Sequence, residues 1–192
     1  MAQTKIKKDL IDASFGNILE QIAYVADGRT LSTSAGNITV PNVTAKQDIS
    51  GTTYVDLTGT NIDYTPPSGA TSVLYEVLFS YAYNALGSSG YLSPFVRVAL
   101  DGTVINSSRK GHLWNSGWDA EMRIAIPIQI VGASDDIANM KVASWGSART
   151  IKTQISTYNA GNYRFASHYN YYGPGSSVQY VVPPFIKITA YS

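Results

Sequence analysis

Residues 72–84, SVLYEVLFSYAYN, form a long run of β-branched, aromatic and aliphatic residues with one charge, at Glu76. Alternate residues beginning with Val73 share one face of a strand, and those beginning with Leu74 share the other. Tyr, Val and Phe favour a pleated surface, and the run has no helical stripe. Because both faces are largely apolar, we expect this strand to lie at the centre of a β-sandwich, between two layers.

The rest of the chain repeats this pattern. The turn YTPPSG at residues 64–69 precedes the central run, and its two prolines cannot donate to a ladder. Further strands are predicted over residues 54–57, 61–65, 95–100, 103–105, 122–131, 140–145, 151–158, 163–172, 178–182 and 185–191. Short strands separated by turns at intervals of roughly 8–12 residues are typical of sandwiches. We therefore predict an all-β fold, an antiparallel jelly-roll β-sandwich over residues 51–192.

Three local features make sharper predictions about the sheets. Asp101-Gly102 separates two apolar runs, as in a hairpin with a type I′ turn. Pro127 cannot donate a ladder hydrogen bond, so its strand has an edge or a bulge there. The buried carboxylate of Glu76 needs a partner, which Arg97 or Arg123 on a neighbouring strand could supply.

The N-terminal part has a different pattern. Ser14 could cap a short helix over residues 15–23, and residues 29–51 have the composition of a linker or an extended edge segment. The apolar residues that recur at helical spacing are Leu10, Ile11, Phe15, Ile18, Leu19 and Ile22. A helix this short must bury its apolar side, either on its own domain or on another protein. We predict that residues 1–50 are an anchoring arm with a short helix.

Composition excludes several classes of function. Charged residues make up 14% of the 192 residues and the net charge is +1, which disfavours a nucleic-acid partner. There are no cysteines, no secretory signal and no apolar run long enough for a transmembrane helix. His112 and His168 lie far apart and outside any metal-ligand motif, so no cofactor or metal is expected. We predict a protein that is not an enzyme.

The enzyme alternative is a glycan hydrolase on a jelly-roll scaffold. Such an enzyme needs two carboxylates roughly 5–10 Å apart in a cleft. The candidates are Glu76, Asp119 and Glu121.

Contact chemistry is better represented than catalysis. Tyr and Trp have flat apolar rings with a polar tip, which suits stacking on sugars or packing between subunits. The chain has 14 tyrosines, many of them between residues 158 and 172, where the alternative is that they fill the core. The candidate glycan or receptor contacts are His112, Trp114, Trp118, Tyr171 and Tyr172.

The order of features resembles small virion proteins of tailed bacteriophages. The similarity rests on TKIKKDLID at residues 4–12, IDYTPPSGATSVLY at residues 62–75 and VVPPFIKITAY at residues 181–191. The C-terminal regions of such proteins are similar to the trimeric jelly-roll heads of tumour-necrosis-factor-like proteins. In those heads a tyrosine-rich sheet faces the threefold axis. The resemblance implies a homotrimer whose interface would include Tyr75, Tyr81, Tyr83, Tyr169 and Tyr180.

These observations lead to a functional expectation. We predict a non-enzymatic phage virion protein, made in the host cytoplasm, that docks onto other virion proteins through its N-terminal arm. We expect the head to be a tail-appendage tip that contacts a host-surface glycan. The alternative is a capsid decoration protein that stabilises the shell.

Overall fold

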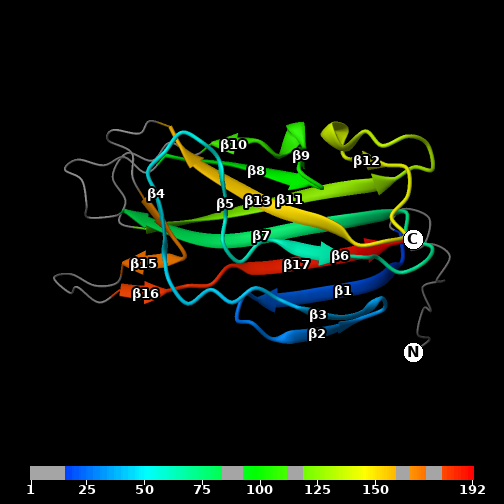
Figure 1. The fold of residues 1–192 in the computed structure, drawn as a ribbon, viewed down its shortest axis with the longest axis horizontal. Coiled ribbons are helices and arrows are strands. Elements are labelled where there is room, and N and C mark those ends of the chain that lie inside the picture. The colour runs from blue at the N-terminus through cyan, green and yellow to red at the C-terminus, as the bar shows by residue number, and fades with distance from the viewer. Residues whose placement is uncertain (1–15, 84–92, 112–118, 159–164, 172–178) are drawn as a thin grey trace, which may run out of the picture.

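The computed structural model describes residues 16–83, 93–111, 119–158, 165–171 and 179–192, which form a sandwich of two β-sheets (Figure 1). The ordered elements in these ranges are strands and two short 3₁₀ helices, Asn106–Ser108 and Ile137–Asn139. None of the helices found in this part of the chain is long and apolar enough to cross a membrane.

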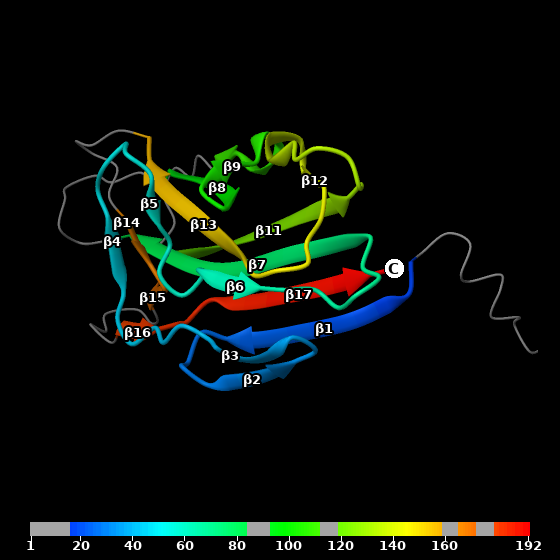
Figure 2. The ribbon, with the colours of Figure 1, turned by 45° about the vertical axis from the view of Figure 1, so that its right-hand side comes forward.

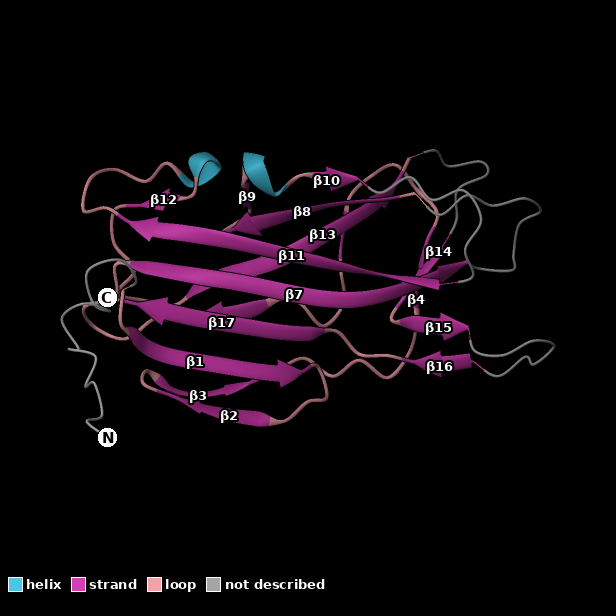
Figure 3. Cartoon of the chain, turned by 180° about the vertical axis from the view of Figure 1, so that it is seen from behind, coloured by secondary structure: helices cyan, strands magenta, loops and turns pink. Residues whose placement is uncertain are grey.

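The first sheet has seven strands. Its order is β1-β17-β7-β11-β12, with β14 paired to β7 and β4 paired to β14. Figure 3 shows β11, β7, β17 and β1 side by side along its length. The strands are β1 (Ile18–Val25), β4 (Gln47–Ile49), β7 (Ser72–Tyr83), β11 (Asp119–Ile130), β12 (Lys141–Val142), β14 (Phe165–Ser167) and β17 (Phe185–Tyr191).

The second sheet has six strands and covers one face of the first (Figure 2). Its order is β10-β8-β13-β5, with β9 paired to β8 and β6 paired to β13. The strands are β5 (Val55–Asp56), β6 (Ile62–Tyr64), β8 (Pro94–Leu100), β9 (Thr103–Val104), β10 (Lys110–Gly111) and β13 (Arg149–Thr157). Two separate hairpins join β2 (Thr30–Thr33) to β3 (Gly36–Thr39) and β15 (Tyr169–Tyr171) to β16 (Gln179–Val181).

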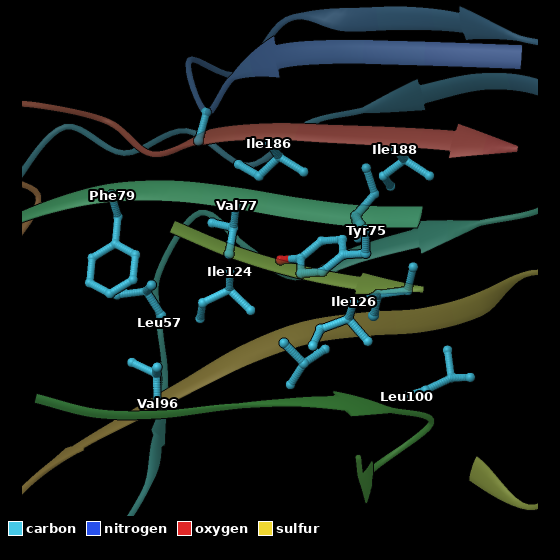
Figure 4. Close-up of a cluster of buried hydrophobic side chains, with 14 of the residues drawn as sticks. Leu57, Tyr75, Val77, Phe79, Val96, Leu100, Ile124, Ile126, Ile186 and Ile188 are labelled. Carbon is cyan, nitrogen blue, oxygen red and sulfur yellow. The ribbon is translucent and has the colours of Figure 1, made fainter. Parts of the chain in front are cut away.

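The core lies between the inner faces of the two sheets, as Figure 4 shows. The predicted central run forms β7, which lies between β17 and β11. Its inward face carries Tyr75, Val77 and Phe79, each no more than 1% exposed. The facing sheet contributes Val96 and Leu100, both fully buried. Alternation along each strand therefore decides which side chains enter the core.

Local turn and pairing predictions are confirmed. Asp101 and Gly102 both have positive φ, 49° and 80°, as a type I′ turn between β8 and β9 requires. Pro127 lies opposite Leu74 of β7. The strand found on the other edge of β11, β12, pairs only with Gln129 and Ile130, so Pro127 faces an edge in the described part of the sheet.

The predicted N-terminal helix over residues 15–23 is wrong. Residues 18–25 form β1, which pairs antiparallel with β17 from Ile18 to Val25. Ile22 and Tyr24 alternate inward and are 7% and 2% exposed. The apolar spacing fits a helix equally well, but pairing with β17 supplies hydrogen bonds and burial that an isolated short helix lacks.

Part of the predicted linker at residues 29–51 forms the β2–β3 hairpin and β4.

Gly59, which follows this segment in the chain, packs closely against Val43 and Pro184. Its φ is +83°, and a Cβ there would lie 2.5 Å from Val43 Cγ2 and 2.8 Å from Pro184 Cγ. Only glycine combines this backbone angle with so close an approach. Whether residues 1–50 act as an anchoring arm stays a prediction.

Candidate binding surface

Several predicted site residues lie outside the described residues: Leu10, Ile11, Phe15, His112, Trp114, Trp118 and Tyr172. The backbones of Tyr171 and Tyr83 belong to β15 and β7, but their side chains are not among those that the structure describes. Of the remaining arm residues, Ile18 and Leu19 are 58% and 40% exposed on β1, whereas Ile22 enters the core.

The tyrosines that were expected at a trimer interface differ in their exposure to solvent. Tyr75 and Tyr81 are fully buried in the core, so neither side chain can reach a second subunit from the folded protomer. Tyr169 is 4% exposed and packs against Ala82 and Ala166. Tyr180 on β16 is 53% exposed. Core filling was the alternative interpretation of the tyrosines between residues 158 and 172. It applies to the buried Tyr169 but not to Tyr158, which is 58% exposed.

Glu76 forms ion pairs with two cations. Arg123 Nη2 contacts Glu76 Oε1, which confirms the predicted partner. Lys187 Nζ lies 3.1 Å from Glu76 Oε2, a second contact that the sequence did not indicate. Burial by itself raises the pKa of Glu76, but the contacts with Arg123 and Lys187 outweigh it and hold that pKa below its ordinary value.

The hydrolase alternative gains no support from these carboxylates. Glu121 lies opposite Ser80 of β7, four positions along the strand from Glu76. Four residues of strand span about 13 Å, beyond the separation that glycoside hydrolysis needs. The side chain of Asp119 lies outside the description. In the described ranges, no three His, Cys, Asp or Glu side chains gather as a metal site would require.

Aromatic side chains gather instead on the outer face of the six-stranded sheet. Phe95 and Tyr158 are stacked, with ring centroids 6.0 Å apart and planes inclined by 26°. Tyr158 is 58% exposed. Gly111 of β10 pairs with Phe95, and a Cβ at Gly111 would lie 2.6 Å from Phe95 Cε1. The missing side chain of Gly111 therefore makes room for the ring.

A row of polar side chains crosses β8, β13 and β5 next to these rings. The register places Arg97 opposite Gln154, and Gln154 opposite Asp56. Arg97 Nε donates to Gln154 Oε1 at 2.7 Å, and Gln154 Nε2 donates to Asp56 Oδ1 at 2.8 Å. Lys152 Nζ lies 2.8 Å from Asp56 Oδ2 and ends the row.

Tyr54 connects the aromatic and polar parts of this surface. Its ring centroid lies 4.0 Å from Arg97 Cζ, so the guanidinium stacks on the ring. We call the whole set the aromatic–polar strip. It consists of Tyr54, Phe95, Tyr158, Arg97, Gln154, Asp56 and Lys152.

Hydrogen bonds stabilise the ionised form of Asp56 in the strip. Burial raises the pKa of Asp56, but the hydrogen bonds from Lys152 and Gln154 and the charge of Lys152 lower it overall. Asp56 is therefore ionised near neutral pH. It acts only as an acceptor there, with one oxygen facing an amide and the other an ammonium group.

Sequence reasoning missed the strip as a site. The alternation of β13 does place Lys152 and Gln154 on one face, and β8 likewise carries Phe95 and Arg97 on one face. However, nothing local indicates that β13 pairs with both β8 and β5. The strip depends on strands about 40 to 100 positions apart in the sequence.

Comparisons with known proteins give no family. No protein-family model matches the chain, and no curated protein matches it. Among solved structures, it is similar to the EclA C-terminal domain, a sugar-binding protein, with 11% identity, 71% of this chain and 84% of that chain covered, and a TM-score of 0.36.

Two other solved structures are similar at the same distant level. One is the CBM36-1 domain of a multidomain xylanase from the hindgut metagenome of Trinervitermes trinervoides (7% identity, 88% and 96% covered, TM-score 0.34). The other is a family 35 carbohydrate binding module from Clostridium thermocellum (10% identity, 93% and 91% covered, TM-score 0.27). Structural similarity at TM-scores this low does not indicate a function for this protein.

Proposed function

We propose that this protein is a non-catalytic binding protein that holds a carbohydrate on the outer face of its six-stranded sheet. The observation that carries the proposal is the aromatic–polar strip, in which the exposed ring of Tyr158 stacks on the partly buried Phe95 beside a hydrogen-bonded row of polar side chains. The proposal therefore rests on the geometry of this chain alone.

The chemistry of the strip suits a sugar. The C–H faces of a sugar ring pack on aromatic rings, and its hydroxyl groups exchange hydrogen bonds with amide, carboxylate and ammonium groups. Gln154 and Asp56 are already held in place by their neighbours in the row. A surface held in its binding geometry loses less side-chain entropy when a ligand arrives.

The predicted glycan contacts His112, Trp114 and Trp118 lie in sequence directly after β10 and outside the described residues. The chain enters their segment from Gly111, which pairs with Phe95 of the strip. We propose that the two tryptophans add stacking surface for a longer glycan. If replacing both by Ala leaves glycan binding and adsorption to host cells unchanged, this extension is wrong.

A direct test compares two exposed tyrosines. Tyr158→Ala should weaken binding to the best ligand on a glycan array by about three- to tenfold, because a stacking ring is lost. Tyr180→Ala is the matched control, since Tyr180 is 53% exposed on a different hairpin. Equal affinities for the wild type and Tyr158→Ala would contradict the proposal, as would an array on which no glycan binds.

The finer proposal is that the sandwich is the jelly-roll head of a phage virion protein that forms a homotrimer and docks through residues 1–50. It is supported by the resemblance around residues 62–75 and by the arm residues Ile18 and Leu19, whose apolar side chains are exposed. Light scattering on the purified protein tests the trimer, and a monomeric mass would contradict it.

Capsid decoration remains the alternative virion role. It predicts that the protein binds empty capsids and raises their resistance to heat. Deleting residues 1–15, which keeps β1 and its core side chains Ile22 and Tyr24, should abolish that binding.

A further inference from the structure

We propose that the carbohydrate held by the strip is an acidic one, and that Arg97 binds its carboxylate. This inference rests on the proposed function and adds the chemical class of the ligand. It follows from the contacts that orient the Arg97 guanidinium and from the absence of an acidic partner for it among the described residues.

Arg97 is fixed on two sides. Its Nε donates to Gln154, and the face of its guanidinium lies on the Tyr54 ring. Its two terminal nitrogens make no hydrogen bond to any residue in the described ranges. The guanidinium is therefore oriented in advance while its terminal donors stay available. A planar fork of this kind matches the two oxygens of a carboxylate.

The charge of Arg97 is also uncompensated within the described part of the protein. Arg29, Arg123 and Arg149 each pair with a carboxylate. Arg97 instead contacts the neutral amide of Gln154 and makes no ion pair with a described acid. The one carboxylate in the strip, Asp56, is already matched by Lys152. The strip thus carries one surplus positive charge, at its centre.

Arg97 and the aromatic stack are also suitably spaced. Arg97 and Phe95 lie on the same face of β8, two residues apart, which corresponds to about 7 Å. A sugar ring on Phe95 and Tyr158 can therefore direct a carboxyl substituent toward Arg97. A neutral sugar would leave the charge of Arg97 without an anionic partner among the described residues.

The test uses oligomers of galacturonate and of mannuronate, each compared with its counterpart in which the carboxyl groups are reduced to alcohols. Calorimetry should show at least one uronate oligomer binding about tenfold more tightly than its reduced counterpart. Arg97→Lys should remove most of that difference, because an ammonium cannot reproduce the bidentate contact. Arg29→Lys is the matched control and should leave it unchanged.

Tyr54 is a positioning residue in this account. Tyr54→Phe keeps the ring beneath the guanidinium and should retain the preference for the uronate. Tyr54→Leu should reduce it at unchanged melting temperature, which a purely structural role would not predict.

The two proposals fail in different ways. If charged and reduced oligomers bind equally well, the acidic ligand is excluded while carbohydrate binding stands. If a sulfated oligosaccharide of the same length binds more tightly than either uronate, the carboxylate assignment is overturned. If no oligosaccharide binds and Tyr158→Ala changes nothing, both proposals are overturned.

Discussion

Tyr75 of the seven-stranded sheet and Thr153 of the six-stranded sheet are joined by a hydrogen bond of 3.1 Å between the tyrosine hydroxyl and Thr153 Oγ1. Both side chains are fully buried. The same tyrosine hydroxyl lies 3.4 Å from the backbone oxygen of Thr60, and Thr60 Oγ1 accepts from the backbone N–H of Thr153. A polar network thus crosses the apolar core and connects the two layers.

Removing the Tyr75 hydroxyl should destabilise the sandwich. We expect Tyr75→Phe to lower the free energy of unfolding by about 1–2 kcal/mol, because Thr153 Oγ1 and the Thr60 carbonyl lose a buried partner. Tyr24→Phe is the control. Tyr24 is 2% exposed and its hydroxyl makes no hydrogen bond to a described residue, so that change should cost nothing. Urea unfolding of both variants measures the difference, and equal costs would contradict the prediction.

Acid should weaken the protein through Glu76. Its pKa lies below the ordinary value in the folded state, so its contribution to stability is complete above about pH 4.5 and is lost as the pH falls further. Glu76→Gln should lower stability at pH 7 by about 1 kcal/mol and flatten the pH dependence below 4.5. Urea unfolding at a series of pH values measures this, and an unchanged slope in that range would show that Glu76 is not responsible.

Acid should also lower the stability of the protein through His168, at a higher pH than through Glu76. It is fully buried with φ of +60°, and burial lowers its pKa to about 4. Between pH 6.5 and 4 the unfolded chain binds a proton that the folded protein does not. The free energy of unfolding should therefore fall by up to about 3 kcal/mol as the pH drops through this range.

His168→Asn tests this assignment, because Asn tolerates the left-handed backbone angle and does not titrate there. The variant should lose the pH dependence between 6.5 and 4 and keep the Glu76 dependence below it. Persistence of the upper transition in His168→Asn would assign it to another group.

Gly111 should affect ligand binding through Phe95. A methyl group at Gly111 would lie 2.6 Å from Phe95 Cε1, so Gly111→Ala must displace the ring from its stack on Tyr158. We expect weaker binding of the best array glycan, by about three- to tenfold. Gly146→Ala is the control, since no atom lies within 4 Å of a Cβ placed there. Unchanged affinity in Gly111→Ala would show that the stack does not contact the ligand.

The strands were predictable where pattern and local chemistry agree. β17 begins and ends at the predicted residues 185 and 191, and Asp101-Gly102 turns as its composition requires. The helix over residues 15–23 failed because its apolar spacing is compatible with both helix and strand. β17 decided between them by offering β1 a partner edge. The sequence of residues 18–25 does not itself indicate that β17 will lie beside it, because β17 is at the other end of the chain.

The sequence alone determined that this is an all-β protein, which residues lie on each face of β7, and that Glu76 requires a cationic partner, either Arg97 or Arg123. These properties follow from alternation, turn chemistry and the cost of burying a charge, which act over a few residues. The tertiary structure decided the rest: which tyrosines fill the core, that Lys187 is the second partner of Glu76, and that Tyr54, Arg97 and Gln154 meet on one surface. Those contacts depend on the register between strands distant in the chain, because a shift of one residue in that register would turn every side chain to the opposite face.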